Sequence, residues 1–316
     1  MVAAPLRVVF FGTPEFAVPS LDALLASRHT VVAVVCQPDR PRGRGHKTSA
    51  GPVKARALSA GVPVLQPERL KDDSFLASLT ALRADLGVVA AYGKILTDAV
   101  LGVPRLGLIN VHASLLPRHR GAAPVHRAII AGERETGVTI MRVVKALDAG
   151  PMLAAAHRTI GDEETSDVVE RDLARIGAPL LVQIADDLAA GAAVEVPQDD
   201  AAATYAPRLT KDDGGLDWNA SAHGIHNLVR GLHPWPHAST FLHGRRLIVL
   251  RALASAEPAE AAPGTVLETR NEFVVAAGSG RVYLVEVQAE GKRPMTAREF
   301  LAGHRVTPGD RFTPAP

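Results

Sequence analysis

The sequence contains a single cysteine, Cys36, in 316 residues. One cysteine cannot form an internal disulfide or supply a C-x-x-C metal site, and the twelve histidines show no H-E-x-x-H spacing. The run that leads to Cys36 is apolar, which favours a structural thiol over a catalytic one. We therefore expect no disulfide, no metal ion and no cysteine chemistry.

Long apolar runs are also missing. No uniformly apolar stretch of about twenty residues is present, and residues 1–7 lead into a strand without the basic, apolar and cleavage regions of a signal peptide. With 47% hydrophobic and 22% charged residues, the composition is that of a soluble globular protein long enough for two domains. We expect a cytoplasmic monomer with no membrane partner.

Glycine-rich nucleotide motifs are absent as well. The strand-to-turn passage at residues 10–14 has one glycine and lacks the G-x-G-x-x-G spacing of dinucleotide sites. The run Gly43-Arg-Gly45 carries no G-K-[ST] ending, so it is no phosphate-binding P-loop. The sequence therefore predicts no bound nucleotide cofactor and disfavours a reaction driven by ATP.

What is present in the first half is an alternation of short β-rich runs with helical patterns. Such an alternation predicts an α/β domain of Rossmann-like type, with a parallel sheet covered by helices on both faces. The expected strands are residues 8–11, 31–36, 62–65, 86–91, 106–112 and 138–144, and the expected helices are 20–27, 52–60 and 72–83.

The second half changes character. A strand at 152–160 precedes a long helix whose apolar positions between 168 and 188 make one face, which we expect to close the first core. Residues 191–207 mix small, acidic and proline residues without periodicity, as a linker does. A short helix at 221–231 and five short β runs then suggest a small barrel, for which an oligonucleotide-binding (OB-like) barrel is the natural candidate among several small β folds. The expected strands are 239–242, 246–250, 264–267, 273–277 and 282–287, and the expected domains are residues 1–190 and 208–316.

Three polar residues lie around the strand expected at 106–112. Asn110 and His112, two apart, point to the same side of the strand, and Asp148 follows the next apolar run in a glycine-containing turn. Attack of an amine on an activated acyl group needs donors for the developing oxyanion, which Asn110 and His112 supply, and a group that accepts a proton and orients the imidazole, which Asp148 supplies. Taken singly, a turn residue, a core histidine and a turn former explain these side chains better.

Positive charge is concentrated in one loop although the net charge is only +2. Arg40, Arg42, Arg44 and Lys47 follow a single acid, Asp39, in a stretch whose prolines and glycines prevent a helix. Guanidinium groups suit phosphate oxygens, and the loop leaves the sheet edge from which the residues after 106–112 also emerge. The sequence thus favours a clamp for an RNA end, and a solvated surface loop is the alternative.

Aromatic residues make up only 4% of the chain, so stacking on successive bases is poorly supported and phosphate contacts should dominate any RNA binding. In the second half the candidates for such contacts are cations that are individually as consistent with a solvated surface. They are Lys211, Arg245, Arg246, Lys292 and Arg293.

Five separated motifs together resemble one family. They are VVFFGTPEFAVPSLDALL at 8–25, QPDRPRGRG at 37–45, VVAAYGKIL at 88–96, NVHASLLPRHRGAAPVHRAI at 110–129 and TGVTIMRVVKALDAG at 136–150. Over nearly its whole length the chain resembles the methionyl-tRNA formyltransferases. It departs from their pattern at His119, where tryptophan is common, and at Lys145-Ala146.

The resemblance implies a reaction and its residues. It implies transfer of formyl from the cosubstrate 10-formyltetrahydrofolate to the methionine amine of initiator methionyl-tRNA, which gives N-formylmethionyl-tRNA for translation initiation. It assigns catalysis to Asn110, His112 and Asp148, and contact with the acceptor arm of the tRNA to the basic loop. It also implies an OB-like C-terminal domain that binds tRNA. Contact with folate falls on Ser114, Leu115, Leu116 and Pro117.

Three alternatives stay open from the residues themselves. A glycinamide ribonucleotide formyltransferase and a sugar-nucleotide formyltransferase would share the chemistry, but the C-terminal half disfavours the first and the second is expected to carry a different appended domain. A non-catalytic RNA-binding protein would tolerate replacement of Asn110, His112 and Asp148 without biochemical loss.

Overall fold

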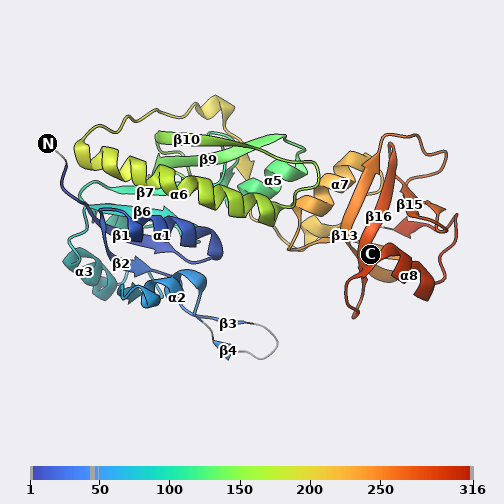
Figure 1. Ribbon diagram of the computed structural model, residues 1–316, viewed down its shortest axis with the longest axis horizontal. Helices are drawn as coiled ribbons and strands as arrows, with labels where there is room; N and C mark the ends of the chain where they lie inside the picture. Colours follow the sequence, from blue (N-terminus) through green and yellow to red (C-terminus); the bar gives the residue numbers. More distant parts are fainter. Residues whose placement is uncertain (1–2, 43–46, 49, 314–316) are drawn as a thin grey trace. The chain divides into compact units, whose positions relative to one another are not determined.

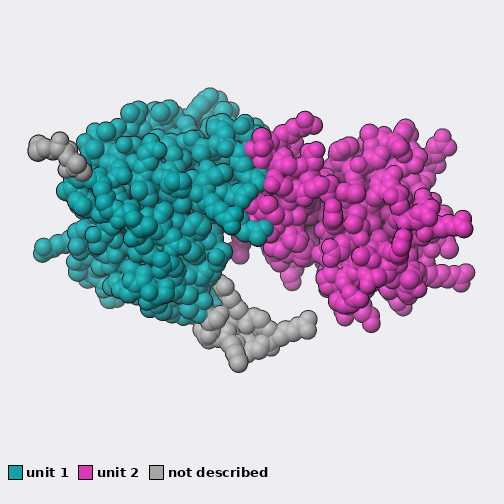
Figure 2. All heavy atoms as spheres, viewed as in Figure 1, with its two compact units in different colours: residues 1–124, 135–158, 170–206 teal, residues 125–134, 159–169, 207–316 magenta. Residues whose placement is uncertain are grey.

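The structure is a computed structural model that describes residues 3–42, 47–48 and 50–313 (Figure 1). The chain forms two compact units, shown in Figure 2. Unit 1 consists of residues 1–124, 135–158 and 170–206, and unit 2 of residues 125–134, 159–169 and 207–316. Among the described residues, no helix is both long and apolar enough to cross a bilayer.

Unit 1 is built on a seven-stranded sheet with the order β10-β9-β7-β6-β1-β2-β5. The strands are β1 (Arg7–Gly12), β2 (Thr30–Val35), β5 (Val64–Leu65), β6 (Leu86–Ala90), β7 (Leu108–His112), β9 (Glu135–Arg142) and β10 (Met152–Thr159). The five strands from β5 to β7 pair in parallel, as expected. Strand β9 departs from the expectation because it runs antiparallel to β7.

The direction of β9 has a physical reason. A parallel pair needs a crossover that returns along the sheet, usually through a helix. The described helix between β7 and β9 is α5 (Pro124–Ile130), and all of it but Pro124 belongs to unit 2, so it supplies no crossover on this sheet. An antiparallel edge on an otherwise parallel sheet is common in α/β domains.

Helices cover both faces of this sheet (Figure 1). Successive strand residues point to opposite faces, so the fully buried Phe10 and Phe11 of β1 enter different cores. Phe10 packs in the core that includes Leu181 of the long helix α6, which closes this core as the apolar pattern predicts. Phe11 packs in the other core with Leu79 of α3. The helices are α1 (Val18–Ala26), α2 (Pro52–Ser59), α3 (Asp73–Ala81), α4 (Asp98–Leu101) and α6 (Ser166–Ala190).

Unit 2 contains a curled antiparallel sheet of the half-barrel type, consistent with the expected OB-like fold. Leu242 of β12 and Arg245 of β13 are paired across a two-residue turn, in which His243 and Gly244 both have positive φ, as a tight hairpin requires. The elements are α7 (Ala222–Gly231), β12 (Ala238–Leu242), β13 (Arg245–Ser255), β14 (Val266–Glu268), β15 (Phe273–Ala276), β16 (Arg281–Ala289), β17 (Met295–Thr296), α8 (Ala297–Gly303) and β18 (Phe312–Thr313).

The core of unit 2 is organised by aromatic rings despite their scarcity. Trp218 stacks on Phe312 with ring centroids 5.2 Å apart, and Phe312 in turn contacts Phe273. The indole N–H of Trp218 donates to Thr240 Oγ1, so the buried ring leaves no unpaired donor. These aromatic residues serve the core of unit 2.

Candidate active site

Strand β7 positions Asn110 and His112 at the end of a buried strand. Leu108 and Ile109 before them are almost fully buried, while Asn110 is half-buried and His112 is 5% exposed. Both polar residues line a cavity of about 750 Å³ in unit 1. Its walls come from the segments after β1 and β6, from the segment after β7, and from the connection between β9 and β10. A site beyond the carboxyl ends of parallel strands is the usual place for a ligand in an open α/β sheet.

The imidazole of His112 has a partner at each nitrogen. Its Nε2 lies 3.0 Å from the carbonyl oxygen of His119, and its Nδ1 lies 3.8 Å from Asp148 Oδ2. Because a carbonyl oxygen only accepts, Nε2 carries a hydrogen and donates it to His119. With Nε2 protonated, Nδ1 is an acceptor in the neutral ring and a donor only in the imidazolium.

Asp148 occupies an unusual backbone conformation. Its φ is 47°, in the left-handed region that aspartate tolerates better than most residues. The turn ends at Gly150, where a Cβ would lie 1.9 Å from the carbonyl oxygen of Arg142, so only glycine fits. Asp148 Oδ2 accepts a hydrogen bond of 2.9 Å from the backbone N–H of Gly121. The carboxylate is thus directed at His112 by backbone geometry.

Residues 114–117, which are expected to contact folate, are held by hydrogen bonds to other parts of unit 1. Ser114 is buried, its hydroxyl donates to the carbonyl of Arg118, and its own carbonyl accepts from Thr139 Oγ1. In the described part of the chain, the residues that line the cavity do not include Ser114, Leu115, Leu116 or Pro117. Contact of these four residues with folate stays a prediction.

The basic loop is only partly described. Arg40 is exposed. Arg42 of β3 (Pro41–Arg42) and Lys47 of β4 (Lys47–Thr48) are backbone partners in an antiparallel pair. Arg44 lies outside the described residues. The loop therefore has a short hairpin at its base, and its contact with RNA stays a prediction.

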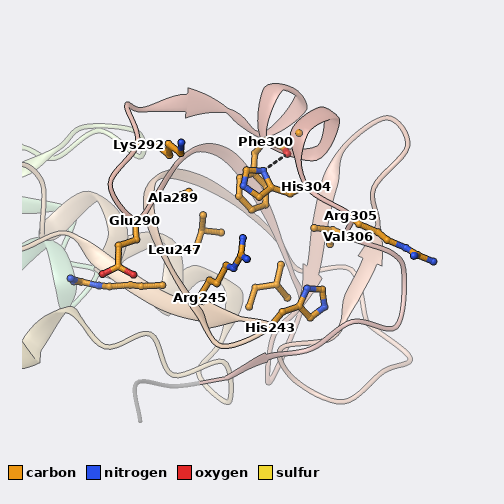
Figure 3. Close-up of a pocket in the computed structure, with 13 residues that line it drawn as sticks. His243, Arg245, Leu247, Ala289, Glu290, Lys292, Phe300, His304, Arg305 and Val306 are labelled. Carbon is orange, nitrogen blue, oxygen red and sulfur yellow. Dashed lines mark hydrogen bonds between the residues drawn. The ribbon is translucent and has the colours of Figure 1, made fainter.

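Several C-terminal cations gather at a second cavity of about 680 Å³ in unit 2 (Figure 3). Arg245, Arg246 and Lys292 line it together with the acid Glu290. The ring of His304 stacks on Phe300 at a centroid distance of 4.2 Å, and its Nδ1 is bonded to the Phe300 carbonyl. Of the other predicted cations, Arg293 is paired with Glu299 and Lys211 lies before a short helical turn.

Two large apolar side chains that line the cavity of unit 1 are not singled out by the sequence pattern. Ile95 is 84% exposed and Leu147 is 57% exposed, both unusual for large apolar side chains. Tyr92 is buried beside them, and burial raises the pKa of its hydroxyl to about 12, so it is no base at neutral pH. Ile95 and Tyr92 follow β6 at the sheet edge used by ligands, a signal that the sequence already contained.

The described residues contain no group of three or more His, Cys, Asp or Glu side chains arranged to hold a metal ion. The thiol of Cys36 is buried, and burial raises its pKa to about 12, which agrees with a structural thiol.

Comparison with known proteins gives consistent similarities. Residues 6–185 match the family model described as formyl transferase, and residues 208–305 match the formyl transferase C-terminal domain. The methionyl-tRNA formyltransferase of Thermodesulfovibrio yellowstonii is 43% identical over 97% of this chain and 99% of its own, and that of Moorella thermoacetica is 47% identical over 96% and 98%. Among solved structures, the sugar 3N-formyl transferase WlaRD, crystallised in the presence of dTDP and 5-N-formyl-THF, matches with a TM-score of 0.69 at 16% identity. The match covers 91% of this chain and 99% of that chain, and it shows the shared fold.

Proposed function

The chain belongs to the methionyl-tRNA formyltransferase family, and from this premise we propose that it formylates the methionine amine of charged initiator tRNA. The donor is 10-formyltetrahydrofolate, and the product is the N-formylmethionyl-tRNA used in translation initiation. The observation that carries the proposal is the meeting of Asn110, His112 and Asp148 at one cavity.

The three side chains match the steps of the reaction. The neutral amine attacks the formyl carbon, the bond from that carbon to N10 of the folate breaks, and N10 takes up a proton. Asn110 donates an amide N–H to the oxygen that gains negative charge, a contact whose loss typically costs about 10²- to 10³-fold in rate. The imidazolium of His112 supplies a second donor to this oxygen from Nδ1, because Nε2 is bonded to the carbonyl of His119. Asp148 stabilises that charge and accepts the amine proton, directly or through a water.

The cavity suits a folate. Its volume of about 750 Å³ lies within the roughly 300–1,000 Å³ that small-molecule sites occupy. The exposed Ile95 and Leu147 offer apolar surface to the flat rings of the cosubstrate. We assign the further folate contacts to Ser114, Leu115, Leu116 and Pro117, because this segment directly follows His112 and is held in place by Thr139.

The charged tRNA requires a larger surface. We assign its acceptor arm to the basic loop with Arg40, Arg42, Arg44 and Lys47, and further phosphate contacts to the cations at the cavity of unit 2. Residues 1–190 then form the catalytic domain, residues 191–207 the linker and residues 208–316 the tRNA-binding domain of a cytoplasmic monomer.

A comparison of acceptors tests the proposal. Labelled 10-formyltetrahydrofolate is offered with methionyl initiator tRNA, with glycinamide ribonucleotide or with an amino-sugar nucleotide. We expect label on the charged tRNA alone, with uncharged tRNA as the matched control. Preferential labelling of glycinamide ribonucleotide or of the sugar nucleotide would replace the proposed acceptor, and binding of tRNA without any formyl transfer would favour the non-catalytic alternative.

A further inference from the structure

The segment between α6 and unit 2 is attached to the active site along residues 196–206, which we name the return segment. At one end, Val196 and Met152 exchange two backbone hydrogen bonds of 2.8 Å. At the other end, β11 (Tyr205–Ala206) pairs in parallel with β8 (Arg120–Gly121). The short strand β8 is the one whose Gly121 N–H binds the carboxylate of Asp148. The return segment therefore contacts both loops that enclose His112.

The side chain of Gln198 joins these two loops. Its Nε2 donates to the carbonyl oxygen of Asp148 at 2.8 Å and to that of Gly150 at 2.7 Å. Its Oε1 accepts from Arg120 Nε at 3.0 Å, and the buried Arg120 is held in turn by Asp200. The amide is therefore oriented with its NH2 group towards the two carbonyl oxygens and its oxygen towards Arg120. A flipped amide would place its oxygen against the two carbonyl oxygens.

The contacts fall where Asp148 needs support. A residue at φ 47° keeps this conformation only when its surroundings determine it, and Gln198 binds the carbonyl of that residue and of the glycine that ends the turn. The other partner of His112 is held by the same segment, since the N–H of His119 donates to Thr204 Oγ1 at 2.8 Å. Both neighbours of the imidazole are thus fixed from residues 198 and 204.

We propose that Gln198 is a positioning residue that holds the Asp148 carboxylate against His112. It touches no reacting atom and acts through the Asp148 turn. The catalytic part of this inference rests on the proposed function, because a displacement of about 1 Å in a catalytic group can lower a rate by about 10²-fold only where that group takes part in the reaction.

Two substitutions of Gln198 distinguish the role of its amide N–H donor from that of the rest of its side chain. In Gln198→Glu the oxygen that faces Arg120 is retained, and the amide donor is replaced by an oxygen that repels the carbonyls of Asp148 and Gly150. Gln198→Ala removes both contacts. Gln183, exposed on α6, receives the same two substitutions as the matched control. Because the Arg120 contact survives in Gln198→Glu, this variant keeps the anchor of the return segment.

The readout is steady-state formyl transfer to methionyl initiator tRNA. We expect both Gln198 variants to lower kcat about 10- to 100-fold while the KM for folate and for tRNA stays within about twofold, and the Gln183 variants to match the parent. Full kcat in Gln198→Glu would overturn the proposal. So would a loss confined to KM, because it would assign Gln198 to substrate binding.

A second readout does not depend on the reaction. In protein with ¹⁵N-labelled histidine, the ring signals of His112, assigned with His112→Gln, should shift in Gln198→Glu and remain unchanged in Gln183→Glu. Unmoved His112 signals in a folded Gln198→Glu protein would overturn the positioning role. If the parent transfers no formyl group at all, the proposed function fails, and the His112 signals still decide whether Gln198 positions the pair.

Discussion

At the scale of single residues, the site depends on backbone conformations that side chains rarely adopt. Asp148, His119 and Gly121 all have positive φ, at 47°, 57° and 120°. They lie in the two loops that hold the imidazole of His112. Strained positions persist only where neighbouring contacts determine them, and they concentrate at functional sites. The geometry of His112 and Asp148 therefore depends on the contacts that support their loops as much as on the two side chains.

His29 gives a residue-scale prediction for stability. Its side chain is fully buried, and Nδ1 accepts from the backbone N–H of Leu6 at 3.1 Å. Burial lowers the pKa of His29 below its ordinary value of 6.5, against the opposing attraction of Asp186. Between the lowered folded pKa and about pH 6.5, His29 stays neutral in the folded protein and binds a proton in the unfolded chain. The contribution of His29 to the free energy of unfolding is therefore complete above about pH 6.5 and is lost as the pH falls towards the folded pKa.

We expect the free energy of unfolding, measured with urea, to fall more between pH 7.5 and pH 5 for the parent than for His29→Gln. Glutamine does not titrate and keeps a hydrogen-bond acceptor at this position. Other histidines contribute equally to both proteins, so the difference belongs to His29. Parallel pH profiles for the two proteins would contradict this account.

The sequence identifies the candidate catalytic residues, but it does not indicate which contacts hold them in place. Spacing on one strand placed Asn110 and His112 together, because alternate residues share a face. The apolar run at 137–144 and the glycine-containing turn after it place Asp148 near them, and the family resemblance assigns catalysis to all three residues. Gln198 stands in a stretch without periodicity, and nothing in its local sequence indicates that its amide reaches two carbonyls fifty residues away. Contacts between segments distant in the chain leave no local pattern.

Among the secondary-structure elements, the length of each apolar run determines whether its strand can be predicted from the sequence. Every strand expected in the first half is present in the sheet, because each lies in a mainly apolar run of at least four residues, although β5 itself has only two. Strands β8 and β11 have two residues each, too few to show any period, and they connect the return segment to the site. The direction of β9 also escaped prediction, since strand patterns carry no information about pairing partners.

The basic loop yields an element-scale prediction. Removing a cation that neutralises a phosphate should reduce the slope of log K against log salt by about 0.7 to 0.9 per cation. We expect Arg42→Ala and Arg44→Ala each to weaken tRNA binding and flatten this slope while the KM for folate stays unchanged. Lys71→Ala, at an exposed position of unit 1, is the matched control. An unchanged slope, or equal damage to folate affinity, would contradict the assignment of the loop.

At the scale of the whole molecule, the two units are not simple halves of the sequence. Unit 2 includes residues 125–134 and 159–169 as well as the C-terminal part of the chain. Within it, Arg230 of α7 donates to the carbonyl oxygens of Gly161 and Glu164, and His226 bonds to that of Asp162. Composition predicts a linker at 191–207, but it does not reveal that earlier segments pack with a later unit.

The proposed role of Asn110, His112 and Asp148 in formyl transfer is tested by single-turnover kinetics. Parent, Asn110→Ala and Asp148→Asn are mixed with saturating 10-formyltetrahydrofolate and methionyl initiator tRNA, and the rate of the first formyl transfer is measured beside tRNA affinity. We expect a rate lower by about 10²-fold or more in each variant, with tRNA affinity unchanged. A rate within about twofold of the parent in either variant would contradict it.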